Sequence, residues 1–101
     1  MRRIQVIVAR TLGAHPAIMT QKNRGCDPIP WFRQLAMHFC YRYKFGCYQY
    51  IGDRFGGREH ATVQHAFTTV RDTIDGPGET MRKRQYQMCL EKIVKAFGPP
   101  P

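Results

Sequence analysis

Two consecutive glycines between two apolar stripes constrain this chain more than any other feature. Gly56 and Gly57 follow a short segment in which Tyr48, Ile51 and Phe55 recur at helical spacing. A longer stripe follows the glycines and consists of Val63, Ala66, Phe67, Val70 and Ile74. Glycine adopts left-handed backbone conformations that other residues avoid, so a glycine pair permits a sharp turn. Two helices joined by such a turn form a helix-turn-helix, which we expect over about residues 47–74.

Apolar residues in the first part of the chain also follow the 3.6-residue period of an α-helix. The first stripe consists of Ile4, Ile7, Val8 and Leu12. It predicts a helix that stops at Gly13, although the run 4–8 on its own also suits a strand. Pro16 is well placed to begin a short second helix, since proline is favoured in the first turn.

A polar, basic loop is predicted over residues 20–30, because glycine and two prolines interrupt this stretch. The next stripe consists of Trp31, Phe32, Leu35, Ala36, Phe39, Cys40 and Tyr43. It predicts a central helix, the longest of the chain, ending near Gly46. The last stripe consists of Tyr86, Cys89, Leu90, Ile93, Val94 and Phe97. We therefore expect an all-α fold of about six helices, as one domain over residues 1–98 with a proline tail at 99–101.

Positive charge is concentrated in the first part of the chain. Of a formal net charge of +9, residues 1–58 contribute +8, from ten lysines and arginines against two acidic residues. Such asymmetry indicates a basic face, and by itself leaves nucleic acid, acidic lipid and acidic protein open as partners. No apolar run has the roughly 20 residues of a transmembrane helix, and the start is no convincing secretory signal. We therefore expect a cytoplasmic protein that does not enter a membrane.

Side chains that would carry catalysis or bind a metal are not grouped in the sequence. His60 and His65 have a spacing found in zinc sites, but no cysteine pair accompanies them. Cys40 and Cys89 lie on apolar stripes and are interpreted as buried thiols. There is no phosphate-binding motif G-x-x-x-x-G-K-[ST]. We expect no metal, no cofactor, no nucleotide binding and no enzymatic activity.

The segment 52–66, GDRFGGREHATVQHA, carries a specific resemblance. It is similar to a signature close to G-D-x-F-G-G-R-D-H-[ST]-T-V-x-H-A, which belongs to the C-terminal DNA-binding domain of the bacterial replication initiator DnaA. Weaker similarity extends from about Ile4 to about Phe97. The resemblance implies a helix-turn-helix of the DnaA C-terminal, Trp-repressor-like type. It also implies that double-stranded DNA is the partner, bound by a monomer at the bacterial nucleoid or in a phage-infected cell.

The resemblance assigns base contacts in the major groove to the tripeptide Glu59-His60-Ala61. Glutamate replaces the usual aspartate and can accept from a cytosine amino group. Alanine replaces the usual threonine or serine, loses the hydroxyl and can still contact a thymine methyl group. The alternative for Glu59 is a purely electrostatic role at the helix N-terminus. The preferred DNA sequence is therefore expected to differ from the usual DnaA box.

Further DNA contacts follow from the same resemblance. Phosphate contacts are expected from Arg33, Gln34, Arg58, Thr62 and His65, with a solvated surface as the alternative for Arg33 and a surface or core histidine for His65. In the family a loop arginine enters the minor groove. An ungapped alignment places Gly25 at that position, so we expect Arg24, one residue earlier in the basic loop, to be the minor-groove residue. Gln49 stands where the family often has a proline that packs on thymine. The run Arg82-Lys83-Arg84 is interpreted as a solvated face without a DNA role.

Sequence-specific binding of double-stranded DNA at DnaA-box-like sites is the function that these expectations favour, in replication initiation or its regulation. A chain without the ATPase module is either an excised domain or a stand-alone protein. Two alternatives use the same basic face: a non-specific DNA binder, and a protein-interaction module.

Overall fold

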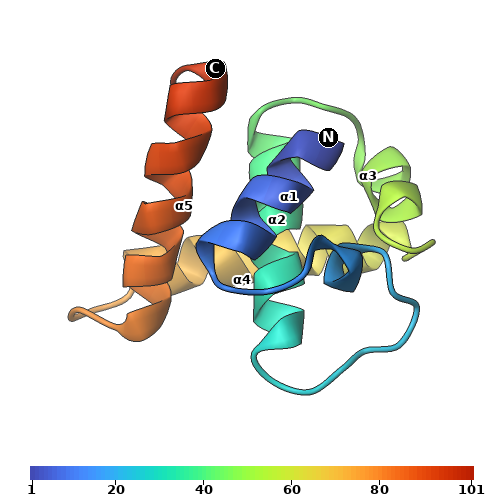
Figure 1. Cartoon of the computed structure of the whole chain (residues 1–101), viewed down its shortest axis with the longest axis horizontal. Coiled ribbons are helices and arrows are strands. Elements are labelled where there is room, and N and C mark those ends of the chain that lie inside the picture. Colours follow the sequence, from blue (N-terminus) through green and yellow to red (C-terminus); the bar gives the residue numbers. More distant parts are fainter.

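The structure is a computed structural model that describes residues 1–101, and it is entirely helical (Figure 1). The elements are α1 (Arg2–Thr11), the 3₁₀ helix η1 (Pro16–Met19), α2 (Ile29–Arg42), α3 (Tyr48–Arg54), α4 (His60–Asp75) and α5 (Met81–Phe97). The all-α class and the six helical segments are therefore confirmed. The stretch 4–8 lies inside α1, so a strand at that place is wrong. None of these helices is long and apolar enough to cross a bilayer.

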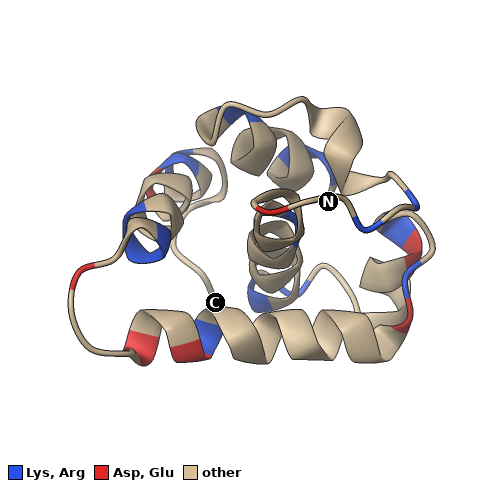
Figure 2. Ribbon diagram, turned by 90° about the horizontal axis from the view of Figure 1, so that it is seen from below, with Lys and Arg blue, Asp and Glu red and all other residues tan.

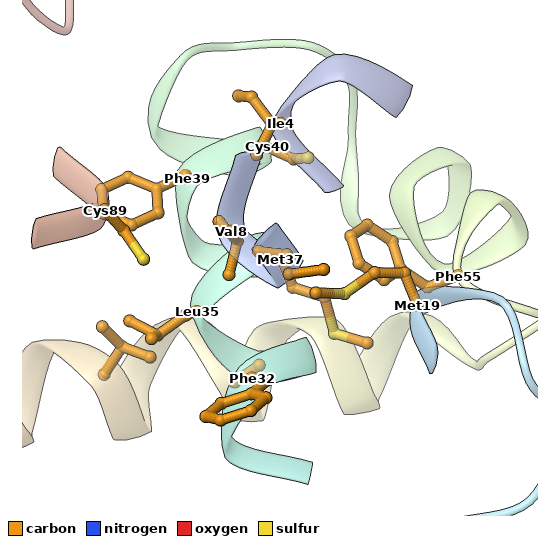
Figure 3. Close-up of a cluster of buried hydrophobic side chains, with 14 of the residues drawn as sticks. Ile4, Val8, Met19, Phe32, Leu35, Met37, Phe39, Cys40, Phe55 and Cys89 are labelled. Carbon is orange, nitrogen blue, oxygen red and sulfur yellow. The ribbon is translucent and has the colours of Figure 1, made fainter. Parts of the chain in front are cut away.

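Helix α2 forms the centre of the fold, and the other helices pack around it (Figures 1 and 2). Its fully buried residues include Leu35, Ala36, Phe39 and Cys40. Figure 3 shows this core, in which side chains of α2 meet those of α1, η1, α5 and the end of α3. The labelled partners from these elements are Ile4, Val8, Met19, Cys89 and Phe55. The apolar stripes thus face one common core, and the prediction of buried thiols at Cys40 and Cys89 is confirmed.

The expected length of α2 was wrong. It has 14 residues and ends at Arg42, whereas α4 has 16 and α5 has 17. The stop comes from Lys44, which adopts the left-handed conformation at φ 60°. The Lys44 N–H donates to the Tyr41 carbonyl (3.0 Å), and the Phe45 N–H donates to the Cys40 carbonyl (3.1 Å). This is the Schellman pattern of helix termination, formed here without the glycine that usually marks it in a sequence.

The helix-turn-helix depends on a close backbone approach at Gly52. Its carbonyl accepts hydrogen bonds from the N–H groups of Phe55 (3.0 Å) and Arg58 (2.9 Å). These two hydrogen bonds hold the end of α3 against the residues that precede α4. A Cβ atom at Gly52 would lie 2.1 Å from the Arg58 carbonyl oxygen, closer than any side chain tolerates. At the turn, Gly56 has φ +76°, and a Cβ there would lie 2.6 Å from the Thr20 carbonyl oxygen. The turn therefore packs directly against the start of the basic loop.

One buried polar residue stands apart from this apolar core. The ring of His38 is 1% exposed and stacks on Phe67, with centroids 4.7 Å apart and planes 17° from parallel. Neither of its ring nitrogens has a hydrogen-bond partner. Burial disfavours the charged form, which lowers the pKa of His38 to about 4. His38 is therefore neutral at physiological pH and acts as an aromatic core residue.

Candidate nucleic-acid interface

The first turn of α4 presents the predicted base-reading tripeptide to solvent. Glu59 is the N-cap residue of α4, but its side chain makes no capping hydrogen bond and no ion pair. His60 and Ala61 follow as the first helical residues, and all three are exposed. The orientation is set by the opposite face of α4, where Val63, Ala66 and Val70 are buried. The tripeptide is therefore free to contact a ligand placed at the N-terminal end of α4.

A cleft of about 390 Å³ lies beside this tripeptide, between the basic loop, the start of α2 and the exposed face of α4. Its lining residues are Arg24, Pro30, Arg33, Gln34, Met37, Arg58, Thr62 and His65. The structure thus brings together Arg24 and all five residues from which phosphate contacts are expected. Their presence around one cleft does not give them one role, because their side chains differ in exposure and in partners.

Arg33 is buried, with 3% of its surface exposed. Its Nε donates to the Ile18 carbonyl and its Nη1 to the Arg24 carbonyl, each at 2.5 Å, and Nη2 lies 3.5 Å from Oε1 of Gln21. Burial, with a smaller contribution from the charge of Arg58, lowers the pKa of this guanidinium. The alternative of a solvated surface is therefore wrong for Arg33, and its phosphate contact stays a prediction. In this structure its donors hold the basic loop.

Arg58 holds the same loop from the other side. Its Nη1 donates to the Phe55 carbonyl in the turn, and its Nη2 donates to the Asn23 carbonyl in the loop at 3.1 Å. The side chain is half-buried, and burial lowers its pKa. We call Arg33 and Arg58 the arginine clamp, because together they bind three carbonyl groups between Ile18 and Arg24. The clamp fixes the loop relative to α2 and to the start of α4.

Sequence reasoning missed the clamp, although a signal for Arg33 was present. Arg33 lies one turn before Ala36 and Met37 on α2, which are both buried, so it belongs to the inward side of the helix. A charged residue on an inward stripe indicates buried hydrogen-bond partners rather than a free surface cation. Those partners come from a loop without periodicity, and the sequence does not reveal where such a loop runs.

The tip of the basic loop remains open to solvent. Arg24 is exposed, and only its backbone carbonyl is engaged, by the clamp. Asp27 of the same loop lies 3.7 Å from the Arg82 guanidinium of α5. Arg82 also lies over the Trp31 ring, 4.6 Å from its centroid, and Lys83 donates to two carbonyl groups of the α4–α5 connection. Arg82 and Arg84 are exposed, as a solvated face requires, while Arg82 and half-buried Lys83 also make contacts within the fold.

The remaining polar positions are exposed on α3 and α4. Thr62 faces solvent, and His65 places its Nε2 at 3.4 Å from Oγ1 of Thr69. Gln49 donates to Oδ1 of Asp53 at 3.1 Å. The neighbouring Tyr48 is half-buried and stacks on Tyr41, as its core interpretation predicts. No group of three or more histidine, cysteine or acidic side chains could hold a metal ion.

Charge differs between the two ends of α4. Figure 2 shows blue segments interspersed with red ones near its N-terminal end, where the loop and α3 lie, and red segments beside a blue one at its other end. The acidic residues of that far end are Asp72 and Asp75. A polyanion is therefore favoured at the N-terminal end of α4, where the free N–H groups of the helix also attract negative charge.

Comparison with known proteins places this geometry in a family. The profile described as "Bacterial dnaA protein helix-turn-helix" matches residues 1–70. A chromosomal replication initiator protein DnaA from Agrobacterium fabrum is 40% identical over 76 residues, which is 72% of this chain and 15% of the relative. The same-named protein of Wolbachia pipientis wMel is 38% identical over 74 residues, or 73% of this chain and 16% of the relative.

The chain therefore spans about one sixth of the length of these relatives. The matched region is a helix-turn-helix rather than a catalytic module. The family match, the sequence identity to DnaA proteins and the helix-turn-helix geometry around Gly52–Glu59 all agree. The chain therefore belongs to the family of the bacterial DnaA helix-turn-helix domain.

Proposed function

We propose that this chain binds double-stranded DNA sequence-specifically at DnaA-box-like sites and acts in replication initiation or its regulation. The observation that carries the proposal is the unengaged tripeptide Glu59-His60-Ala61 on the first turn of α4, next to a cleft lined by cations and neutral donors. A recognition helix reads base edges with its N-terminal residues, which is where these three side chains lie. Membership of the DnaA helix-turn-helix family supports the same reading.

In this proposal the tripeptide enters the major groove. The Glu59 carboxylate accepts from a cytosine amino group, His60 donates to a base edge, and the Ala61 methyl group contacts a thymine methyl group. Loss of a hydroxyl at Ala61 removes one hydrogen bond that relatives with threonine or serine can form. The preferred site therefore differs from the usual box at the position that Ala61 faces.

Phosphate contacts fix the register of the helix on the duplex. Exposed Thr62 and His65 offer donors from α4, and half-buried Gln34 offers its amide from α2. Arg24 extends from the fixed loop toward the adjacent minor groove. Arg33 and Arg58 contribute charge to the cleft while their donors hold the loop. We propose a monomer as the binding species, so that a palindromic site is not required.

Fluorescence anisotropy on three duplexes tests the proposal: a DnaA-box duplex, one with its central bases scrambled, and random DNA, each at two salt concentrations. The expected result is preference for the box at both salts. Equal, salt-sensitive binding to all three duplexes would instead identify a non-specific binder. Absence of binding to any duplex would leave the protein-interaction module as the function.

The variant His60→Ala tests the role of the tripeptide. Loss of one good base contact costs about 1–3 kcal/mol of specific affinity and leaves binding to random DNA nearly unchanged. The His60 side chain is exposed and makes no hydrogen bond in the fold, so the free energy of unfolding should not change. An equal loss of affinity on box and random DNA would contradict base reading by His60.

A further inference from the structure

A second groove lies between α1, the end of η1 and α3. It has a volume of about 420 Å³ and is lined by Met1, Arg2, Gln5, Thr20, Tyr50 and Arg54. We call it the α1–α3 groove. At Thr20 and Arg54 it continues into a cleft of about 600 Å³ that passes Lys22 and the glycine turn. None of the six residues that line the α1–α3 groove lines the cleft beside the tripeptide, although the continuation past Lys22 shares Arg58 with that cleft.

The cations of the α1–α3 groove are held by neutral partners. Nη1 of Arg2 donates to Oε1 of Gln5 at 3.0 Å, and Nη2 of Arg54 donates to the Tyr50 hydroxyl at 3.1 Å. The Arg54 guanidinium also lies 5.0 Å from the centroid of the Tyr50 ring. Neither arginine takes part in an ion pair, because the two pairs in the fold involve other residues. Their positive charge is therefore oriented but not neutralised.

A hydrogen bond from a buried side chain ties the two helices together at the floor of the groove. Gln5 is 2% exposed, and its Nε2 donates to the Arg54 backbone carbonyl at 2.9 Å, which ties α1 to the end of α3. Asp53 is the one acidic residue along the extended groove, and its carboxylate accepts from Gln49 rather than from an arginine. The groove thus offers two preorganised guanidinium groups around a fixed amide. Preorganised guanidinium groups bind carboxylates well, because two parallel N–H groups match the two carboxylate oxygens.

The position of the groove favours a protein ligand over DNA. Figure 2 shows α1 and α4 on opposite sides of α2, so the α1 wall of the groove lies away from α4, whereas its α3 wall packs on α4. Tyrosine, methionine and arginine are the residues that protein interfaces enrich. Tyr50 is 43% exposed and forms an aromatic wall beside Arg54. We propose that the α1–α3 groove binds an acidic, extended peptide segment of a partner protein, independently of DNA.

The test uses a fluorescein-labelled deca-glutamate peptide as the probe and anisotropy as the readout. The double variant Arg2→Gln/Arg54→Gln removes both groove cations. Its matched control, Lys92→Gln/Lys95→Gln, removes two exposed cations of α5 that have no hydrogen bond or ion pair. Both variants have the same net charge, so a difference between them reports position rather than total charge. Circular dichroism and thermal melting confirm that each variant is folded.

The expected result is about tenfold weaker peptide binding by the groove variant and less than about twofold weakening by the control. The groove variant and the control variant should bind DNA, either a duplex or an oligothymidine, with equal affinity. Equal loss of peptide binding in both would overturn the proposal, since it would show diffuse attraction to a basic protein. A groove variant that loses duplex binding more than peptide binding would also overturn it and assign the groove to DNA. If the double variant does not fold, Arg2→Gln alone takes its place, because Arg2 is an exposed cation of the groove, and unchanged peptide binding there counts against the proposal.

Discussion

Replacing Arg33 by methionine separates two roles that an arginine beside DNA can have. Methionine keeps the length and apolar stem of the side chain and removes the guanidinium. The Arg24 carbonyl and the Gln21 amide lie in an exposed loop, so both regain hydrogen bonds from water. The Ile18 carbonyl belongs to a residue that is only 8% exposed and is left without its donor. An unpaired buried acceptor costs about 1–3 kcal/mol, partly offset because a buried charge is removed as well.

We therefore expect Arg33→Met to lower the free energy of unfolding by about 1–2 kcal/mol, measured by urea denaturation. Hydrogen exchange in the loop, residues 20–28, should accelerate in the folded protein. Affinity for the preferred duplex should fall, because the loop that carries Arg24 is no longer fixed.

The salt dependence of DNA binding distinguishes a positioning role from a phosphate contact. Each phosphate contact that is lost reduces the slope of log Kobs against log salt by about 0.9. Arg33→Met should leave this slope within about 0.3 of the wild-type value, whereas the exposed control Arg24→Met should lower it by up to about 0.9 without loss of stability. A slope reduced by about 0.9 in Arg33→Met, together with unchanged stability and loop exchange, would refute the clamp and restore Arg33 as a phosphate ligand.

Two further predictions concern stability. Gly52→Ala should lower the free energy of unfolding by at least about 2–3 kcal/mol, because its Cβ would lie 2.1 Å from the Arg58 carbonyl oxygen. In Gly57→Ala the Cβ meets no atom, so only the left-handed φ of +75° is unfavourable and the loss should be about 1–2 kcal/mol. Equal, small losses in urea denaturation would show that α3 and α4 need no close approach. The pKa of His38 falls from 6.5 to about 4 on folding, so the unfolded chain binds more protons than the folded one in this range. The contribution of His38 to the free energy of unfolding is therefore complete above pH 6.5. It is lost as the pH falls toward 4, by about 3 kcal/mol in total. His38→Phe should remove this part of the pH dependence, and identical pH profiles for variant and wild type would show that His38 does not titrate in this window.

The parts of the fold that the sequence predicts well are those that local patterns determine. The stripe from Val63 to Ile74 gives α4 and its buried face, and Gly56-Gly57 gives the turn, because both depend on residues close in sequence. The end of α2 depends on Lys44 in a left-handed conformation, which lysine adopts only when neighbouring hydrogen bonds support it. That support becomes visible only in the folded chain.

The candidate site divides in the same way. The exposure of Glu59, His60 and Ala61 follows from the helical phase of α4, so the structure places them where the sequence indicates. Arg33 differs, because its partners are carbonyl groups of residues 18 and 24 that no periodicity locates. The resemblance to the DnaA family assigns Arg33 a phosphate contact, whereas its burial against the loop is a tertiary effect. The pairing of Asp27 with Arg82 is non-local for the same reason.

The arginine clamp has a consequence for the DNA that such a domain can accept. Because the loop and the start of α4 are tied to each other, the side chains at the two ends of the proposed site stand at a set separation. One inserted base pair moves the halves of a duplex apart by about 3.4 Å. A tethered loop cannot stretch to follow that displacement, whereas a loose one can. Binding sites for this domain should therefore tolerate changes of base more readily than changes of spacing.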